Sequence, residues 1–207
     1  VLSQQIKGRA QYEAAIQLAE RGLSLSSEDS TERVIFLCWL SEAKTKQGQF
    51  AEAGEYAQQA YPLSMALDDP IYLADSLTKL GDVATGQSEY AVAKQHFERG
   101  LEIAQQADNP LRVAQCLNNL GIVFATQGYF AEALEYFQQT LRIFTELNLE
   151  RSRANSLGNI GMVTNSLGNS AEGDDYQRQA FEIYDRIGDR RGKGLMLMGR
   201  GVAAFFQ

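Results

Sequence analysis

The stretch LNNLG at residues 117–121 indicates the fold, because closely similar stretches stand forty residues before and forty residues after it. These are LTKLG at residues 77–81 and LGNIG at residues 157–161. Nine positions after each closing glycine comes an aromatic residue or a serine, and three positions further on a small residue: Tyr90 and Ala93, Phe130 and Ala133, Ser170 and Gly173. A fixed period of this length is typical of solenoids, which display one extended surface. The repeat therefore favours a binding protein.

The central repeat predicts two helices joined by a short turn. Asn109-Pro110 is a typical helix start, with a capping asparagine before a proline at the first helical position. Apolar residues then recur at intervals of three and four until Gln127-Gly128, where the glycine indicates a helix end. A second helix is expected to begin near Tyr129 and to fade at Asn148, and the next one to begin near Glu150.

The same pattern can be laid over the whole chain, which predicts a single all-α solenoid. It has four full helical hairpins flanked by incomplete pairs at both ends. Because the chain starts at Val1 without methionine and in the middle of the pattern, we expect it to be a fragment of a longer protein. The expected repeats are residues 1–29, 30–69, 70–109, 110–149 and 150–189, with a partial repeat 190–207 whose helix begins near Arg190 and stops at Gln207.

Small residues at matched positions predict that the two helices of each hairpin approach closely. A glycine inside a helix costs roughly 0.5–1 kcal/mol relative to alanine, so its recurrence indicates a packing requirement. The residues are Ser41, Gly81, Gly121 and Gly161 on the first helices and Ala53, Ala93 and Ala133 on the second helices.

The C-terminal part of the chain departs from the pattern. Ser170, Gly173 and Gln177 replace the aromatic, alanine and aromatic of the other repeats, and the lost apolar area predicts a loosely packed helix. Arg200 stands where a core leucine is expected, and Phe205-Phe206 follow. This end is either a decayed repeat or a surface that docks onto the rest of a longer chain or onto a second copy, because exposed apolar ends of solenoids associate.

The pattern resembles the tetratricopeptide repeat, with two large apolar residues and a small one on the first helix, then aromatic, small, aromatic and small on the second. It is similar to the longer variety, of about 40 residues, found in kinesin light chains, spindle-orientation adaptors and bacterial transcriptional regulators of the large ATPase type. HEAT and armadillo repeats have similar periods but lack Leu-x-x-Leu-Gly followed by aromatic-x-x-Ala. The resemblance implies a right-handed α-α superhelix and a non-catalytic interaction scaffold.

In that family the first helix of each pair lines the concave face, so the resemblance implies a groove that holds a peptide or helix of a partner. We call these first helices the leading helices. The candidate peptide-binding residues lie beside the core leucines: Trp39, Glu42, Asp75, Thr78, Lys79, Asp82, Gln115, Asn118, Asn119, Ile122, Asn155, Asn159 and Met162.

The amides among these candidates carry the binding hypothesis. Gln115 and Asn119, like Asn155 and Asn159, are four residues apart and therefore share a helix face. Stacked leading helices would make the amides a ladder, and an amide offers both a donor and an acceptor to the backbone of a partner. Related repeats hold extended peptides through such asparagines. Asparagine is also a poor helix former, which favours a binding role.

A plainer interpretation stays open. Polar residues between core leucines are solvated in any amphipathic helix, so the asparagines can be ordinary surface. Lys79 interrupts the ladder in the preceding repeat, where it can form a surface ion pair with Asp75, four residues earlier.

Charge and cysteine content disfavour several other classes of protein. The net charge is -7 and the isoelectric point is about 4.8, which disfavours binding to nucleic acid and to anionic membranes. No apolar run has the length of a membrane span, and no signal peptide is visible. Cys38 and Cys116 stand far apart inside helical patterns, so we expect reduced thiols and a cytoplasmic location.

The sequence also shows no pattern that indicates catalysis, so we expect no enzyme activity, no metal and no cofactor. His96 is the only histidine, whereas a metal site needs several ligands. No carboxylate pair is placed for acid–base chemistry, and no glycine-rich phosphate loop occurs. Three functions remain: a scaffold for a partner protein or for a segment of its own parent chain, an effector-sensing region of a larger bacterial signalling protein, and a self-association module.

Overall fold

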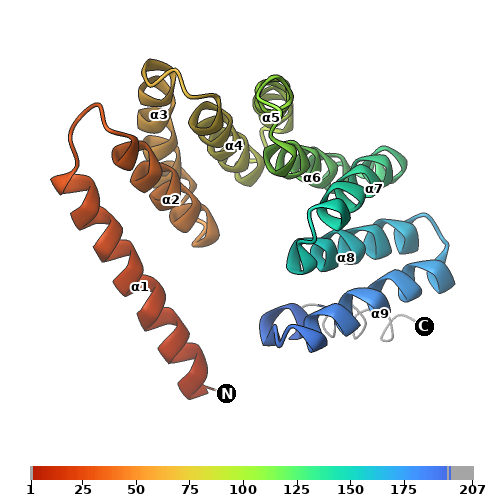
Figure 1. The fold of residues 1–207 in the computed structure, drawn as a ribbon. Helices are drawn as coiled ribbons and strands as arrows, with labels where there is room; N and C mark the ends of the chain where they lie inside the picture. Colours follow the sequence, from red (N-terminus) through yellow and green to blue (C-terminus); the bar gives the residue numbers. More distant parts are fainter. Residues whose placement is uncertain (1, 195, 197–207) are drawn as a thin grey trace. The chain divides into compact units, whose positions relative to one another are not determined.

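The computed structural model describes residues 2–194 and 196, with side chains from Tyr12 onward, and these residues form helices joined by short turns (Figure 1). The chain is helical again from Arg190, as the sequence predicts, whereas Arg200, Phe205-Phe206 and the expected helix end at Gln207 lie outside the described residues. The helices are α1 (Leu2–Leu25), α2 (Thr31–Lys46), α3 (Phe50–Ala66), α4 (Pro70–Gly86), α5 (Tyr90–Gln106), α6 (Pro110–Thr126), α7 (Phe130–Glu146), α8 (Glu150–Ser166) and α9 (Ser170–Arg186).

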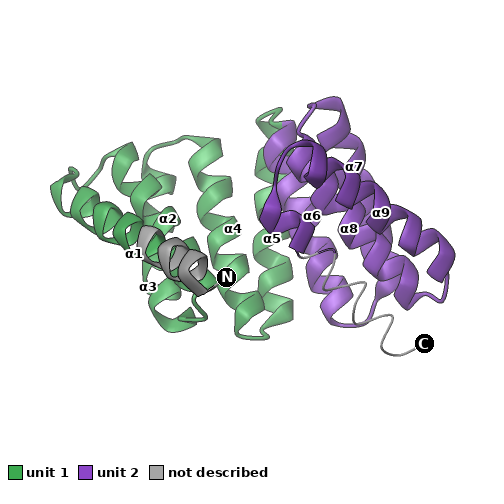
Figure 2. Cartoon of the chain, turned by 90° about the horizontal axis from the view of Figure 1, so that it is seen from below, with its two compact units in different colours: residues 1–109 green, residues 110–207 purple. Residues whose placement is uncertain are grey.

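The described helices confirm the predicted hairpins. α2 packs against α3, α4 against α5, α6 against α7 and α8 against α9, while α1 is the incomplete pair at the start. The chain divides into two compact units, residues 1–109 and residues 110–207 (Figure 2), and this division falls on a predicted repeat boundary. Unit 1 holds α1 to α5 and unit 2 holds α6 to α9. That both units belong to one continuous solenoid stays a prediction.

The helix starts follow local capping chemistry. The side chain of Asp69 accepts a hydrogen bond of 2.8 Å from the backbone N–H of Ile71, and Pro70 is the first residue of α4. Ser30 caps α2 in the same way, because its Oγ accepts from the N–H of Arg33 at 3.2 Å. Such caps satisfy backbone donors that have no partner inside the helix.

From the turn after α2 onward, each described turn between helices contains one residue in the left-handed backbone region. Gly128 has φ +85°, as expected for a glycine that ends a helix. At the matched position after α4 the chain carries Ser88, with φ +63°. A residue with a Cβ is strained in this conformation by roughly 1–2 kcal/mol.

Ser88→Gly is therefore expected to stabilise unit 1. We expect a gain of about 0.5–1 kcal/mol in the free energy of unfolding, because relief of strain exceeds the entropy that glycine adds to the unfolded chain. Denaturant unfolding measures the change. Gly128→Ser is the reciprocal control and should destabilise unit 2 by a similar amount. Equal stability of both variants and the wild type would contradict the assignment of strain to this position.

The glycines of the leading helices do mark close contacts, but their neighbours are aromatic rings. A Cβ built on Gly121 would lie 2.7 Å from the ring of Phe137, and one on Gly81 would lie 2.5 Å from the ring of Phe97. The repeat pattern predicts that Ala93 and Ala133 make the close contact with these glycines. Both alanines are buried, but the ring one turn further along lies on the glycine, because only the absence of a Cβ leaves room for it.

The last hairpin is closely packed, contrary to the expected looseness. A Cβ on Gly161 would lie 2.7 Å from the backbone oxygen of Gly173, so α8 and α9 approach each other backbone to backbone. The side chain of Gln177 is buried beside this contact, and Tyr184 is almost fully buried further along α9. The glycines let the helices close over the space that an aromatic ring fills in the α4–α5 and α6–α7 hairpins.

Candidate functional site

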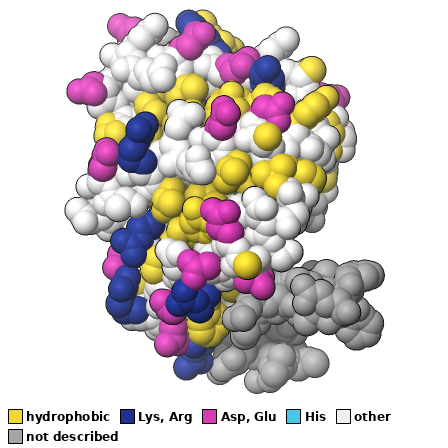
Figure 3. Space-filling view, turned by 90° about the vertical axis from the view of Figure 1, so that its right-hand side faces the viewer, with side chains coloured by type: hydrophobic (Ala, Val, Ile, Leu, Met, Phe, Trp, Pro, Cys, Tyr) yellow, Lys and Arg dark blue, Asp and Glu magenta, His cyan; other side chains and the backbone are white. Residues whose placement is uncertain are grey.

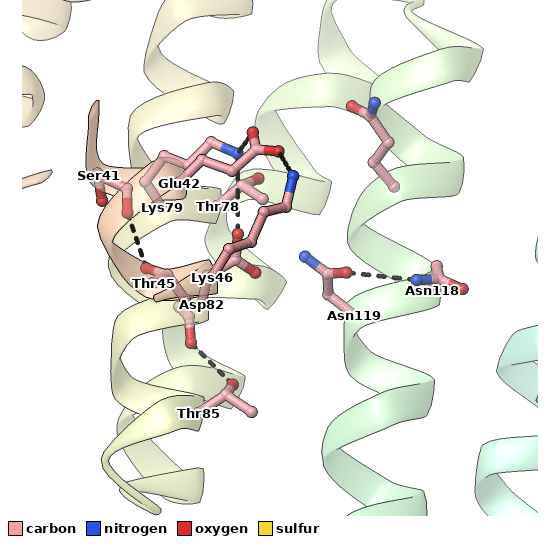
Figure 4. Close-up of polar contacts among 12 residues, drawn as sticks. Ser41, Glu42, Thr45, Lys46, Thr78, Lys79, Asp82, Thr85, Asn118 and Asn119 are labelled. Carbon is pink, nitrogen blue, oxygen red and sulfur yellow. Dashed lines mark hydrogen bonds and ion pairs between the residues drawn. The ribbon is translucent and has the colours of Figure 1, made fainter. Parts of the chain in front are cut away.

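In unit 1 the leading helices α2 and α4 pack against each other and bring three predicted site residues into one charged cluster (Figure 4). The ammonium nitrogen of Lys79 lies 2.8 Å from Oε2 of Glu42 and 3.8 Å from Oδ2 of Asp82. The other oxygen of Glu42 pairs with Lys46, one turn later on α2. Only 16% of the Lys79 side chain is exposed. We call Glu42, Lys79 and Asp82 the ion cluster.

The ion cluster corrects the expected role of Lys79. The sequence leaves open that Lys79 is only part of an exposed ion pair on its own helix. In the structure Lys79 pairs with Glu42, from the preceding leading helix, and is largely buried. The contact therefore links two repeats, and it is not a solvated surface pair.

Burial and charge act in opposite directions on the titration of the ion cluster. Burial disfavours the Glu42 carboxylate, but Lys79 and Lys46 outweigh it and lower the pKa of Glu42 to about 2. Burial dominates at Asp82 and raises its pKa to about 6, against the attraction of Lys79. Burial opposes the charge of Lys79 as well, but Asp82 and Glu42 together raise its pKa.

The other candidates in unit 1 lie on the same two helices, α2 and α4. The indole ring of Trp39 is 37% exposed and lies 6.4 Å, centroid to centroid, from the ring of Tyr12 on α1. The hydroxyl of Thr78 donates to the backbone oxygen of Ala74 at 2.8 Å. Asp75 is half-buried.

In unit 2 the predicted amides meet across successive leading helices. Nδ2 of Asn159 on α8 donates to Oδ1 of Asn118 on α6 at 3.2 Å. Nδ2 of Asn118 in turn donates to Oδ1 of Asn119 at 3.4 Å (Figure 4). One turn after Asn119 and Asn159 stand Ile122 and Met162, which are 38% and 49% exposed. We call these five residues the amide face.

The remaining two amides have partners that the sequence analysis missed. Oε1 of Gln115 accepts a hydrogen bond of 2.8 Å from Arg112 on the same helix. Oδ1 of Asn155 accepts one from the hydroxyl of Tyr184, on the second helix of the last hairpin. The one available signal for Tyr184 was its place in the repeat, forty residues after the core residue Phe144.

The two cysteines and the single histidine of the chain lie inside helices and are buried or half-buried. Cys38 and Cys116 are buried as free thiols in α2 and α6. His96 is half-buried on α5, and burial lowers its pKa. Among the residues that the structure describes, no group of three His, Cys, Asp or Glu side chains is placed to hold a metal ion. Within the same part of the chain, no helix has both the length and the apolar character to cross a membrane.

Exposed apolar side chains are a general feature of the surface. One face of the molecule shows them next to acidic and basic side chains (Figure 3). In unit 2 the exposed apolar residues include members of the amide face, Ile122 and Met162. Such a mixture occurs on interfaces and on the rest of a protein surface alike, so the composition alone does not mark a binding site.

Comparison with known proteins identifies the repeat. A family model described as the tetratricopeptide repeat matches residues 32–106 and again residues 72–146. No curated protein matches the chain significantly.

Several solved structures have a similar fold. Aspartyl phosphate phosphatase F from Bacillus subtilis has a TM-score of 0.75 at 20% identity, over 86% of this chain and 46% of its own, so this chain spans about half of that protein. A Rap protein complexed with competence and sporulation factor has a TM-score of 0.83 at 18% identity, over 93% and 55%. The repeats of a putative kinesin light chain from Podosopora anserina have a TM-score of 0.63 at 18% identity, over 90% and 93%. These identities indicate a shared fold only.

Proposed function

The chain belongs to the tetratricopeptide repeat family, and from this premise we propose that it is a non-catalytic scaffold that binds a protein partner. The partner contributes a peptide or a helix, which lies along the leading helices. In unit 1 the contact residues are Trp39, Glu42, Asp75, Thr78, Lys79 and Asp82, and in unit 2 they are Gln115, Asn155 and the amide face. We propose a cytoplasmic location, in keeping with the buried free thiols.

The observation that carries this proposal is the amide face. Its asparagines come from two successive leading helices and bond to one another, so their amides are held in place before a partner arrives. The exposed Ile122 and Met162 beside them offer apolar contacts for a partner's side chains. Amides that pair with a backbone, next to apolar anchors, suit a peptide whose side chains vary.

The fold of the similar structures supports a binding role. The Rap protein, whose TM-score of 0.83 is the highest of the three structures described above, was solved in complex with competence and sporulation factor. The proposed occupant of this chain is a segment of another protein. A segment of a longer parent chain, a second copy of this chain and a small effector are the alternatives that binding experiments can distinguish.

The amide face is expected to contribute measurably to the affinity of selected peptides. Peptides are selected from a displayed random library against the wild-type chain, and their affinity is measured by calorimetry. Asn119→Ala combined with Asn159→Ala should weaken binding by about tenfold to a hundredfold, because each lost hydrogen bond removes about 0.5–1.5 kcal/mol. Gln138→Ala combined with Gln139→Ala, two exposed amides on α7, is the matched control and should leave the affinity unchanged.

Circular dichroism separates loss of binding from loss of fold in these variants. Unchanged helicity with weakened binding supports the proposal. Full affinity of the Asn119 and Asn159 variant for every selected peptide would show that the amide face is ordinary surface. Light scattering on the same samples tests self-association, since a monomer at high concentration excludes a second copy as the occupant.

A further inference from the structure

Tyr184 is a buried residue of α9 whose hydroxyl bonds to a candidate site residue, Asn155. Its side chain is only 1% exposed and packs in a core with Ala154, Leu157, Ala180 and Ile183. A Cβ built on Gly192 would lie 2.2 Å from the tyrosine ring, so the backbone of the following helical segment covers the ring as well. The ring is therefore enclosed by α8, α9 and the chain after α9, while its hydroxyl reaches Asn155.

The hydroxyl of Tyr184 is not needed for packing. At the matched position of the preceding hairpin stands Phe144, which is also buried and has no hydroxyl. The residue that matches Asn155 there is Gln115, whose oxygen accepts from Arg112 instead. A buried hydroxyl requires a hydrogen-bond partner, and in the last hairpin that partner is the amide of an exposed residue on a leading helix.

This bond fixes which way the Asn155 amide faces. The oxygen and the nitrogen of an amide lie on opposite edges of one planar group. Because Oδ1 of Asn155 is bound to Tyr184, its Nδ2 lies on the edge away from the tyrosine, where it is a donor. The amide of Asn159 is oriented the other way round. Its Nδ2 donates to Asn118, so its Oδ1 is the atom that can accept a hydrogen bond from a partner.

We propose that Tyr184 is a positioning residue that, together with Asn118, makes Asn155 and Asn159 an oriented donor–acceptor pair for the backbone of an extended partner segment. Four residues of a helix rise about 6 Å. Two residues of an extended chain span about 6.6 Å, and each such repeat presents one C=O and one N–H on a given side of the chain. The pair therefore offers a donor to a partner C=O and an acceptor to a partner N–H. The inference rests on the proposed peptide-binding function and specifies an extended chain rather than a helix, whose backbone groups are already bonded internally.

The role of Tyr184 in orienting the Asn155 amide can be tested without a binding partner. In the whole chain labelled with 15N, relaxation of the side-chain NH2 groups reports how firmly each amide is held. Asn155 and Asn159 should both be ordered in the wild type. In Tyr184→Phe, the order of Asn155 should fall to that of an exposed amide such as Asn169, while Asn159 stays ordered. Phenylalanine fits this repeat position, as Phe144 shows, so the variant should fold. Tyr176→Phe removes a hydroxyl from the same helix and should change neither amide.

The recognition part uses the peptides selected against the wild type. Tyr184→Phe should weaken their binding by about two- to tenfold, the range for one lost hydrogen bond. Replacing one backbone amide of the peptide by an ester removes one N–H. At one peptide position the lost N–H is the one that donates to Oδ1 of Asn159. The ester at that position should weaken binding to the wild type but should not weaken binding to the Asn159→Ala variant further.

The outcomes separate the two proposals. An Asn155 amide that is equally mobile in the wild type and in Tyr184→Phe overturns the positioning role, whether or not any peptide binds. An ordered Asn155 with unchanged affinity in Tyr184→Phe overturns the donor role of the pair. Failure to select any peptide contradicts the peptide-binding function and the paired recognition together. The relaxation data then still decide whether Tyr184 holds the amide.

Discussion

Phe137→Ala is expected to lower the free energy of unfolding by about 3–5 kcal/mol, the typical loss for a large aromatic side chain in a protein core. The ring of Phe137 is fully buried and packs against Ile160 and Val163 of the next hairpin. It also lies on Gly121 of its own hairpin. Alanine would leave a cavity between three helices, and the loss should extend beyond one hairpin because the ring links two of them.

The contact between Phe137 and Gly121 allows a sharper test than a single variant. Gly121→Leu alone should destabilise unit 2, because its Cβ already falls within 2.7 Å of the ring. In Phe137→Ala the leucine has space, so the two changes together should cost less than their sum by about 0.5–3 kcal/mol. Tyr129→Ala, an aromatic residue that is 54% exposed, is the matched control and should cost no more than about 1 kcal/mol.

Denaturant unfolding followed by circular dichroism measures these differences, and amide hydrogen exchange locates them. Loss of protection in α6 and α7 should accompany the loss in α8, because the buried ring contacts both hairpins. If the losses in free energy of unfolding from Phe137→Ala and Gly121→Leu were strictly additive, the ring of Phe137 would not pack against Gly121. A small effect of Phe137→Ala would contradict the packing described for unit 2.

Lys79→Met is expected to destabilise unit 1 by about 2–3 kcal/mol at pH 7. Methionine keeps most of the volume but leaves the carboxylates of Glu42 and Asp82 without their shared cation. Removing one partner of a fully buried pair costs about 3–5 kcal/mol. We expect less here because 40% of the Glu42 side chain is exposed and solvent screens its charge.

The loss caused by Lys79→Met should shrink as the pH falls. Without the lysine, the folded-state pKa values of Glu42 and Asp82 rise from about 2 and about 6, so the folded variant takes up protons more readily than the wild type. Uptake by the folded state favours folding at low pH. The difference between variant and wild type should therefore be larger at pH 7 than at pH 4.

A matched lysine serves as the control for this experiment. Lys94→Met removes an exposed cation that lies 3.6 Å from Glu98 on the same helix, and it should change stability by no more than about 0.5 kcal/mol at either pH. Thermal or denaturant unfolding at pH 7 and pH 4 gives the stability difference of each variant from the wild type at each pH. A loss from Lys79→Met that is as small as the control, or that grows toward pH 4, would contradict the buried ion cluster.

Much of the fold follows from the sequence because its signals are local. The capping and proline chemistry at Asp69-Pro70 and the left-handed glycine at Gly128 act within a few residues, so helix ends could be predicted from them. The forty-residue period placed the boundary between residues 109 and 110, where the compact units also divide. The helical period further predicted which faces the candidate residues share, since residues four apart lie one above the other.

Which side chains meet depends on the assembled hairpins and could not be predicted from the sequence. The sequence placed Lys79 and Asn159 on leading-helix faces, but Lys79 bonds to Glu42, 37 residues away, and Asn159 to Asn118, 41 residues away. Tyr184 reaches Asn155 across a hairpin, and Gly161 meets the backbone of Gly173 where the two preceding hairpins insert a ring. Periodicity determines the face on which a residue lies, because that depends on the helix alone. The side chain that the residue contacts depends on how closely two helices pack and on which rotamers fit between them. Both are set only when the hairpins assemble.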